Sequence, residues 1–398
     1  MKSVYVCSEC GKEYPVEPDR YLCSECSAAQ KEDEPLRGIL EVRLEGKLPD
    51  DWEAVRQGQA RRLLDGSLEA DVRSVLPVDK KFFPPIPVGG TPLWQPEPRP
   101  NNAQGPRLFL KDDTANPTSS LKDRASYLVA AFARQYGLKD IVVASTGNAG
   151  SSMAGVAAAA GLNVRLYLPV AAPPAKIVQA MQYGAHVIKV DGTYDDAFDA
   201  SLAYVTEHGG LSRNTAHNPL TVEGKKTAAL EIFLQLGGCL PDSVFVPTGD
   251  GVILAGIYKG FEDLISWGLA KTMPKVFCVQ SEGSCSLTRA LESGAFGARV
   301  PSTTLADSIS VDVPRGGYIA LQRMKRHGGE SILVSDNEIL KGQLYASRLG
   351  LFCEPAAAAA VAGFLKVKDT LPAGSKAVVM ATGNGLKDIA SAMKGVEA

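Results

Sequence analysis

The sequence is poor in histidine, in net charge and in long apolar runs. Its 398 residues include only 4 histidines, and 42 lysines and arginines stand against 44 acidic residues, giving a formal net charge of −2 at pH 7. Such a balance provides no global attraction to nucleic acid or to an anionic membrane. The longest runs of small apolar residues, 153–162 and 356–365, are shorter than the roughly 20 residues that a membrane-spanning helix needs. We therefore expect no nucleic-acid partner and no membrane partner.

The first residues carry no apolar segment of the kind found in secretory signals, because a cysteine pair already begins at Cys7. We therefore expect a cytoplasmic protein. Hydrophobic residues make up 45% of the chain, which is enough for a sizeable core. At roughly 100–200 residues per domain, the length predicts two or three domains.

Half of the 8 cysteines are grouped near the start of the chain. Cys7, Cys10, Cys23 and Cys26 form the pattern C-x2-C-x12-C-x2-C. Two such pairs can bring four thiolates onto one tetrahedral ion, so the spacing is typical of a zinc ribbon. A zinc whose four positions are all filled by sulfur is structural rather than catalytic. The alternative is an unstructured segment with four free thiols or two disulfides.

From residue 108 onward, short aliphatic runs alternate with longer helical patterns. The runs predict strands at 140–144, 164–168, 186–190, 243–247, 275–280 and 376–381. The patterns predict helices at 151–161, 176–184, 194–208, 222–236, 252–267 and 354–366, with a further helical patch at 51–64. Strands of continuous apolar character between helices are typical of a parallel sheet covered on both faces. The fold class is therefore α/β.

Three loops that follow predicted strands are rich in glycine, hydroxyl and amide groups: 145–150 (STGNAG), 248–251 (TGDG) and 382–385 (TGNG). Ligands of open α/β sheets bind at such strand ends. The loop at 248–251 enters a helix, whose first N–H groups favour an anion, although Asp250 would repel a phosphate unless it turns away or is paired. The loop at 145–150 suits a carboxylate or a polar ring substituent. The alternatives are a tight turn without ligand and an N-cap before a close-packed helix.

Lys122 stands in the stretch NPTSSLKDRAS, at the start of a predicted helix for which Thr118–Ser120 supply N-cap candidates. A lysine is unfavourable at the positive end of a helix dipole. That position, with some burial, would lower the pKa of the amine and make it a better nucleophile. The alternative is a surface lysine paired with Asp112 or Asp113.

Taken together, the anion-binding loop, the carboxylate-sized loop, the polar loop at Thr382 and the activated lysine suit a pyridoxal-phosphate site. Such a site places the cofactor phosphate at a helix N-terminus, a Schiff base on a lysine and a protein group at the ring nitrogen.

Six segments carry a resemblance to a known family: IPVGGTPL (86–93), LKDDTANPTSSLKDRAS (110–126), STGNAGSSMAGVAAAAG (145–161), NPLTVEGKKT (218–227), VPTGDGVILAGIYKGF (246–261) and ATGNGLKD (381–388). In this combination and order they resemble threonine synthase, of the β-family (fold type II) of pyridoxal-phosphate enzymes. The N-terminal cysteine pairs are similar to an extension found on some threonine synthases. The resemblance runs from about Ile86 to Ile389.

The resemblance implies a role for each matching position. Lys122 would form the Schiff base and shuttle protons, Asn148 would bind the 3′ oxygen of the cofactor, and Thr382 would meet its ring nitrogen. The cofactor phosphate would be held by Gly249, Asp250, Gly251, Val252 and Ile253. The substrate carboxylate would be held by Ser145, Thr146, Asn148 and Ala149.

The implied reaction converts O-phosphohomoserine and water to L-threonine and phosphate, and the implied assembly is a homodimer. We expect a ribbon domain at 1–40, a large cofactor-binding domain at 41–137 and 214–398, and a small α/β domain at 138–213. The active site would then lie in the cleft between the two lobes.

The sequence departs from the family pattern where the substrate phosphate should bind. Family members supply a lysine and an arginine at positions that correspond to Ala171 and Thr221 here. The remaining candidates for this task are Arg213, Lys176, His217 and Lys225. Asp250 stands where the family has asparagine, and the smaller changes at Ser119 and Leu121 are mild.

Two other functions stay open at this point. One is another β-family enzyme with a smaller substrate, such as a threonine/serine ammonia-lyase or a β-replacement synthase. The other is a non-catalytic scaffold or binding protein that carries a zinc ribbon.

Overall fold

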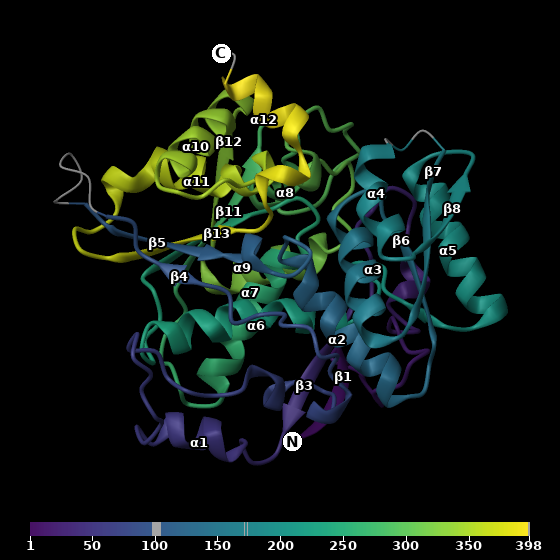
Figure 1. Cartoon of the computed structure of the whole chain (residues 1–398), viewed down its shortest axis with the longest axis horizontal. Coiled ribbons are helices and arrows are strands. Elements are labelled where there is room, and N and C mark those ends of the chain that lie inside the picture. Colours follow the sequence, from purple (N-terminus) through teal and green to yellow (C-terminus); the bar gives the residue numbers. More distant parts are fainter. Residues whose placement is uncertain (98–104, 171, 173, 397–398) are drawn as a thin grey trace.

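The computed structural model describes residues 1–97, 105–170, 172 and 174–396, without the side chains of 174–176. Its strands form three sheets, which the ribbon diagram in Figure 1 places around a central group of helices. The three sheets share no strand, and they have six, four and three strands.

The largest sheet has six strands in the order β12-β11-β10-β13-β5-β4. The edge strand β4 is antiparallel to β5, and the other neighbours are parallel. Its strands are β4 (Leu93–Trp94), β5 (Arg107–Asp112), β10 (Ser243–Pro247), β11 (Lys275–Ser281), β12 (Glu330–Val334) and β13 (Lys376–Ala381).

Two further sheets complete the set. A parallel sheet in the order β8-β7-β6-β9 consists of β6 (Asp140–Ala144), β7 (Asn163–Pro169), β8 (His186–Val190) and β9 (Leu211–Ser212). An antiparallel sheet in the order β2-β1-β3 consists of β1 (Lys2–Cys7), β2 (Glu13–Tyr14) and β3 (Leu40–Glu45). The third strand of this sheet therefore runs past residue 40, the end of the predicted ribbon domain.

The helices lie on both faces of the two parallel sheets (Figure 1). They are α1 (Asp50–Arg56), α2 (Lys122–Gln135), α3 (Asn148–Ala160), α4 (Pro174–Gln182), α5 (Tyr194–His208), α6 (Leu220–Gln235), α7 (Val252–Ser266), α8 (Ser286–Ser293), α9 (Gly317–His327), α10 (Asp336–Arg348), α11 (Pro355–Val367) and α12 (Ile389–Val396).

The alternation of side chains along β10 explains how both faces of the large sheet are covered. Successive side chains of a strand point to opposite faces. Val244 and Val246 pack into the cluster that contains α6 and α7, whereas Phe245 packs into the cluster that contains α11. The ring of Phe245 meets that of Phe364 on α11 at a centroid distance of 5.6 Å. The apolar side chains of β10 thus pack into two hydrophobic cores, one on each face of the sheet.

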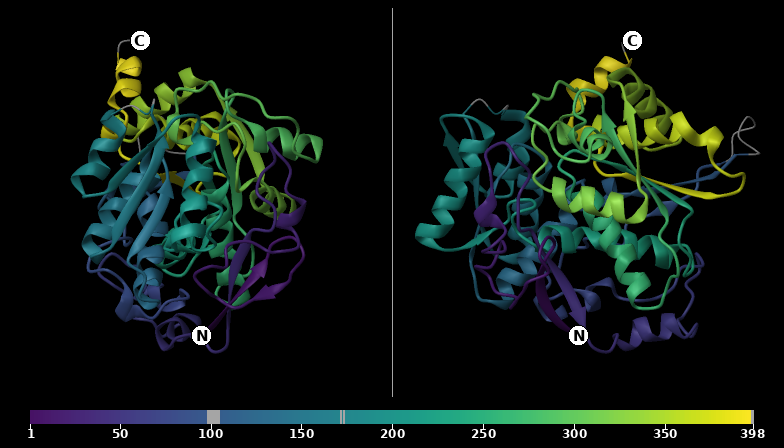
Figure 2. Two further views of the ribbon diagram at one scale, coloured as in Figure 1. Left: turned by 90° about the vertical axis from the view of Figure 1, so that its right-hand side faces the viewer. Right: turned by 180° about the vertical axis from the view of Figure 1, so that it is seen from behind.

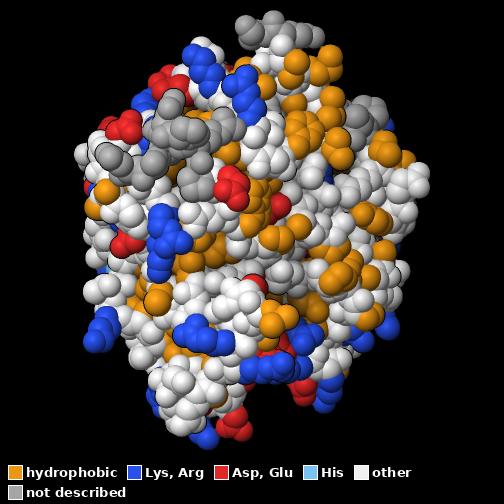
Figure 3. All heavy atoms as spheres, turned by 60° about the vertical axis from the view of Figure 1, so that its left-hand side comes forward, with side chains coloured by type: hydrophobic (Ala, Val, Ile, Leu, Met, Phe, Trp, Pro, Cys, Tyr) orange, Lys and Arg blue, Asp and Glu red, His pale blue; other side chains and the backbone are white. Residues whose placement is uncertain are grey.

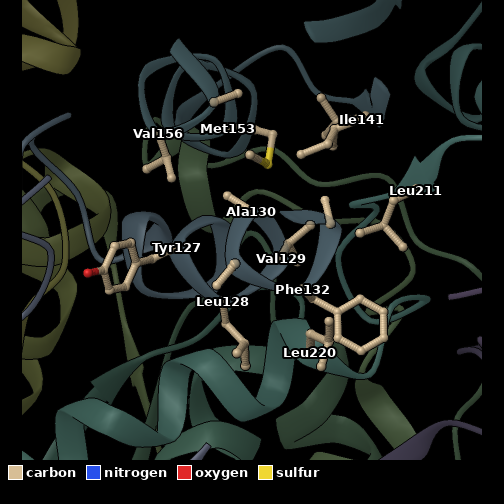
Figure 4. Packing of buried hydrophobic residues seen from close by; sticks show 14 of the residues in the cluster. Tyr127, Leu128, Val129, Ala130, Phe132, Ile141, Met153, Val156, Leu211 and Leu220 are labelled. Atoms are coloured by element: carbon tan, nitrogen blue, oxygen red, sulfur yellow. The ribbon is translucent and has the colours of Figure 1, made fainter. Parts of the chain in front are cut away.

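Helix α2 lies between α3 and α6. It packs against α3 on one side and against α6 on the other, as Figure 4 shows for Met153 and Val156 of α3 and Leu220 of α6. Eleven consecutive residues, Asp123–Ala133, are buried along it. Helix α2 is therefore packed along most of its length against α3 and α6.

The N-terminal segment lies against the rest of the fold, as the purple ribbon in Figure 2 shows. The hydroxyl of Tyr21 accepts a hydrogen bond from the N–H of Ser212 at 2.9 Å. The N–H of Leu36 donates to the carbonyl of Arg315 at 3.0 Å. The cysteine-rich segment is thus a folded part of the body, and the alternative of an unstructured segment is wrong.

The predicted strands are all present, and four of them have the predicted bounds. The helical patch expected at 51–64 is shorter, because α1 ends at Arg56 and Gly58 turns the chain with φ +70°. Helix α3 begins at Asn148, three residues before the predicted start at Ser151.

The described part of the chain contains no helix that is both long and apolar enough to cross a membrane. Figure 3 shows one face of the molecule, on which basic and acidic side chains are interspersed. This mixture agrees with the nearly balanced charge of the sequence.

Candidate active site

Lys122 is the first residue of α2, as the sequence predicted, but the helix is capped differently. Leu121 occupies the N-cap and offers no side-chain cap. Thr118 instead turns its N–H and hydroxyl to the carboxylate of Asp123, with an N···O distance of 2.7 Å. The expected cap from Thr118–Ser120 is therefore wrong, because Asp123 attracts these groups and Ser119 takes a positive φ of 67°.

The amine of Lys122 has no carboxylate neighbour of the kind that the surface alternative requires. Asp113 is bound by Arg124 at 2.7 Å, and Asp112 accepts from the N–H of Thr114 at 3.1 Å. Lys122 is only partly exposed, and burial, together with the cation of Arg213, lowers the pKa of its amine. The surface interpretation of Lys122 is wrong.

The loop that follows β13 lies directly beside the start of α2. The N–H of Leu121 donates to the carbonyl of Thr382 at 2.9 Å, and the N–H of Asn384 donates to the carbonyl of Ser119 at 3.0 Å. These two bonds tie the segment before Lys122 to the loop that carries the buried Thr382.

The loop that follows β6 brings Asn148 to a buried carboxylate that sequence reasoning missed. The amide Nδ2 of Asn148 donates to both carboxylate oxygens of Glu354 at 3.0 Å, and to the hydroxyl of Ser308 at 3.3 Å. Burial raises the pKa of Glu354, and the amine of Lys122 opposes this shift. The N–H of Glu354 donates to the carbonyl of Gly383 at 2.9 Å, so this residue links two of the three loops.

The remaining residues of this loop form the entry to α3. Ser145 is buried and its hydroxyl accepts the N–H of Gly147 at 3.2 Å, while Thr146 and Ala149 are partly exposed. A cavity of about 230 Å³ opens beside the loop. Its lining includes Asn148, Ser151, Ser308, Glu354 and Lys387.

The loop that follows β10 is tightly packed around its glycines. A Cβ at Gly249 would lie 2.6 Å from the Cα of Ile309, and Gly251 has a φ of +82°. Val252 and Ile253 begin α7. The first N–H groups of a helix have no partner within the helix, so this turn offers them to an anion.

Asp250 turns toward a neighbouring loop. Its Oδ1 accepts the N–H of Arg315 at 2.6 Å, and its carbonyl accepts the N–H of Gly316 at 2.9 Å. Burial raises the pKa of Asp250, while the charges of Arg315, Lys122 and Lys225 counteract the rise. The sequence required Asp250 to turn away from a phosphate or to be paired, and the hydrogen bond from Arg315 gives the carboxylate a partner.

Of the positions expected to bind a substrate phosphate, Ala171 and the side chain of Lys176 lie outside the described residues. The hydroxyl of Thr221 is used within its own turn, where it donates to the carbonyl of Asn218 at 2.7 Å. Arg213 and Lys225 are both fully buried.

His217 lies at the edge of this group, under the cysteine-rich segment. Its ring packs against that of Tyr21 at an interplanar angle of 30°, with centroids 4.6 Å apart. Burial, and the nearby charge of Arg315, lower the pKa of His217 to about 4. The ring is therefore neutral at physiological pH and is no cation for a phosphate.

The four cysteines of the N-terminal segment converge. The sulfur atoms of Cys7, Cys10, Cys23 and Cys26 all lie within 4.8 Å of one another, and none of these cysteines forms a disulfide. The hydroxyl of Tyr14 donates to the sulfur of Cys23 at 3.0 Å. Four thiols at these separations fit a tetrahedral metal ion with sulfur ligands.

Comparison with known proteins gives consistent matches. A family model described as "Pyridoxal-phosphate dependent enzyme" matches residues 86–383. The threonine synthase of Methanosarcina acetivorans is 32% identical over 391 residues, which cover 96% of this chain and 91% of that protein. The threonine synthase of Synechocystis is 36% identical over 284 residues, 71% of this chain and 72% of that protein. The solved structure of a threonine deaminase from T.th. has 27% identity and a TM-score of 0.63, covering 74% of this chain and 92% of that one.

Proposed function

The chain belongs to the family of pyridoxal-phosphate dependent enzymes, and on this basis we propose that it is a threonine synthase that converts O-phosphohomoserine and water to L-threonine and phosphate. The expected α/β architecture of fold type II is confirmed. The observation that carries the proposal is the amine of Lys122, which stands at the start of α2 with a lowered pKa, beside the loop of Thr382 and close to the charges of Asp250 and Glu354.

The residues around Lys122 fit the cofactor. The first turn of α7, with Gly249 packed against Ile309, leaves backbone N–H groups for its phosphate, since no side chain shields them at the glycines. Lys122 would hold the cofactor through Nζ, and the hydroxyl of Thr382 would bind its ring nitrogen. When bound, the cofactor supplies an electron sink for carbanion chemistry.

Lys122 is the group that would move protons. A general base works best when its pKa lies near the working pH. Burial lowers the pKa of Lys122, and so does the neighbouring cation of Arg213. Its Nζ can then be neutral, accept a proton from a substrate carbon, and return it at the adjacent carbon.

Asn148 would orient the cofactor ring at its 3′ oxygen, with Glu354 holding the amide. Both oxygens of Glu354 accept from Nδ2, which fixes the amide plane and points its carbonyl oxygen away from that carboxylate. Ser145, Thr146 and Ala149 would bind the substrate carboxylate with hydroxyls and N–H groups. Their place in the turn before α3 supports this assignment, because the positive end of the helix dipole favours a carboxylate there.

The decisive experiment is incubation of the purified protein with O-phosphohomoserine. Threonine and phosphate released in equal amounts support the proposal. The runner-up is a threonine/serine ammonia-lyase, which the structural similarity to a threonine deaminase and the lack of a basic residue at Thr221 favour. Formation of 2-oxobutanoate from threonine, without turnover of O-phosphohomoserine, would establish that activity instead.

We further propose that the four cysteines bind one structural zinc, that the enzyme is a cytoplasmic homodimer, and that the lobes follow the domain limits given above. The convergence of the four sulfur atoms supports the zinc. The remote alternative, a non-catalytic scaffold, predicts a protein that develops no absorbance of a bound cofactor when pyridoxal phosphate is added.

A further inference from the structure

Two buried basic side chains, Arg213 and Lys225, stand beside Lys122. Arg213 lies in the loop between β9 and α6, and Lys225 lies in the second turn of α6. Both side chains have an exposure of 0%. Cations this deeply buried are almost always paired with an anion, because desolvation of a bare charge costs several kcal/mol.

The partners of both cations are neutral. Arg213 donates to the hydroxyl of Thr215 at 2.8 Å, to the hydroxyl of Ser126 at 3.2 Å and to the carbonyl of Lys122 at 3.5 Å. Lys225 donates to the carbonyl of Thr221 at 2.9 Å. Within the described part of the chain, neither residue forms an ion pair.

Lys226, the next residue of α6, is a buried lysine that does form ion pairs. Lys226 is equally buried, but its amine meets the carboxylate of Asp263 at 2.8 Å and that of Glu223 as well. One residue earlier, the amine of Lys225 turns back along α6 toward Thr221 and the start of α2. The two lysines are therefore equally buried, but only Lys226 is paired with carboxylates.

The acidic groups that face this region are already engaged elsewhere. Burial lowers the pKa of Lys225, and the nearby charges of Lys122 and Arg213 lower it further, which places the three basic groups in one region. Asp250 faces Lys122 and Lys225, Glu354 also faces Lys122, and Asp123 faces Arg213. These three carboxylates accept hydrogen bonds from the backbone of Arg315, from Asn148 and from Thr118, and among the described residues none of them forms an ion pair with Arg213 or Lys225.

We propose that Arg213 and Lys225 bind the phosphate group of the substrate and retain it when it leaves, in place of the basic residues that are missing at the family's positions. The inference rests on the proposed function. In the net reaction the Cγ–O bond of O-phosphohomoserine breaks and its electron pair stays with the phosphate oxygen. One hydrogen moves from Cβ to Cγ, and water supplies the hydroxyl that bonds to Cβ and the proton of the released hydrogen phosphate. The two cations stabilise the charge that develops on this oxygen.

The location of Arg213 favours the phosphate of the substrate over that of the cofactor. The cofactor phosphate is assigned to the first turn of α7. Arg213 instead contacts the start of α2, through the carbonyl of Lys122, and lies near Tyr194 of α5 in the other lobe. An anion held by Arg213 would thus lie between the start of α2 and α5.

The test uses the holoenzyme and the variants Arg213→Gln and Lys225→Gln, with Lys226→Gln as the matched control. Inorganic phosphate is the probe, titrated by calorimetry and by the rise in melting temperature that a ligand of the native state produces. We expect the Kd for phosphate to rise about tenfold or more in each of the two variants, since each loses a charge-assisted hydrogen bond. We expect kcat/KM for O-phosphohomoserine to fall about a hundredfold, while the affinity for pyridoxal phosphate stays unchanged.

The control variant Lys226→Gln should lose stability but bind phosphate as the wild type does, because its amine serves Asp263 and Glu223. Neither Arg213→Gln nor Lys225→Gln leaves a carboxylate unpaired, so both should fold. Unchanged phosphate affinity in both variants overturns the proposal. So does a loss of pyridoxal-phosphate affinity with phosphate binding intact, which would assign the pair to the cofactor. Failure of the wild type to turn over O-phosphohomoserine would refute the proposed function, and the phosphate titrations would still decide whether these two residues bind an anion.

Discussion

The carboxylate of Asp250 accepts a hydrogen bond from the backbone N–H of Arg315 at 2.6 Å. This bond engages one oxygen of a carboxylate that stands beside the N-terminus of α7, where the cofactor phosphate is proposed to bind. An asparagine, which the resemblance to the family leads us to expect at this position, can accept the same hydrogen bond without the charge. Asp250 therefore makes the hydrogen bond that an asparagine amide would make at this position. In addition, its negative charge attracts the basic groups of Lys122 and Lys225.

We expect Asp250→Asn to bind pyridoxal phosphate about tenfold more tightly, because one carboxylate is removed from the neighbourhood of a phosphate dianion. The Kd is measured by titrating the apoenzyme and following the absorbance of the bound cofactor. Asp250→Leu, which cannot accept from Arg315, should instead lower the melting temperature. Weaker cofactor binding in the asparagine variant would contradict this account.

Lys122→Ala should abolish turnover, with a loss of at least about 10²–10⁴-fold, the range typical of a positioned general base. The fold should persist, because Lys122 forms no ion pair among the described residues, and Asp250 and Glu354 keep their hydrogen bonds from Arg315 and Asn148. Circular dichroism and the melting temperature check the fold, and phosphate release checks the activity. Phosphate release at the wild-type rate would refute the role of this lysine.

Replacement of Glu354 should act through Asn148, in a graded way. Glu354→Gln keeps one acceptor oxygen for Nδ2 of Asn148, whereas Glu354→Ala keeps none. We expect the alanine variant to lose about tenfold or more in kcat, as expected when a charge-assisted hydrogen bond that orients a functional group is removed, and the glutamine variant to lose less. The absorbance maximum of the bound cofactor should move in the same order. Equal effects of the two changes would show that Asn148 is not positioned by this carboxylate.

The double change of Cys7 and Cys10 to serine should release one zinc per chain and lower the melting temperature, because Tyr5, Cys7 and Leu40 pack into the same core as α2. The metal is counted with a colorimetric chelator, and turnover per folded molecule is compared below the melting temperature. Cys239→Ser, at an exposed cysteine outside the cluster, is the control and should change neither the zinc content nor the melting temperature. Loss of turnover in a fully folded zinc-free variant would argue against a purely structural metal.

His217 should make stability depend on pH. Its pKa is about 4 in the folded chain, against 6.5 for the ordinary side chain, because burial disfavours the charged ring. The unfolded state therefore binds more protons between these two values, and stability falls as pH falls from 6.5 to 4. The loss amounts to about 3 kcal/mol at most, at 1.36 kcal/mol per pKa unit. Urea unfolding at several pH values should show this slope in the wild type and a smaller slope in His217→Gln.

Local patterns in the sequence were sufficient for the elements that carry the site. Aliphatic runs such as 140–144 and 243–247 identify buried strands, and the loops after them contain the residues that the structure brings to Lys122. The elements from α8 to α10 carry weaker patterns and were not predicted. Their side chains are mixed in character because each helix buries only one face, as in α9 and α10.

Glu354, Arg315 and the unpaired state of Arg213 had no signal in the sequence. Glu354 precedes an alanine-rich helix, where an acidic residue is common and indicates no further role. The fold nevertheless places it in contact with Asn148, which is 206 residues away in the sequence. Arg315 holds Asp250 through its backbone N–H, a contact that any residue other than proline can make. Whether a buried charge has a partner depends on which distant segments pack around it, and no local pattern records that.

The α/β class, the strand-end loops, the position of Lys122 at the start of a helix and the spacing of the four cysteines that converge could all be derived from the amino-acid order. These features depend on side-chain periodicity, on glycine and on short-range spacing, which act over a few residues. The packed chain was needed to establish how α2 is capped, where Asp250 points and that Arg213 and Lys225 are buried without an ion pair among the described residues. Burial and charge pairing are properties of the packed interior, because desolvation and Coulomb interactions depend on neighbours that are close in space and distant in sequence.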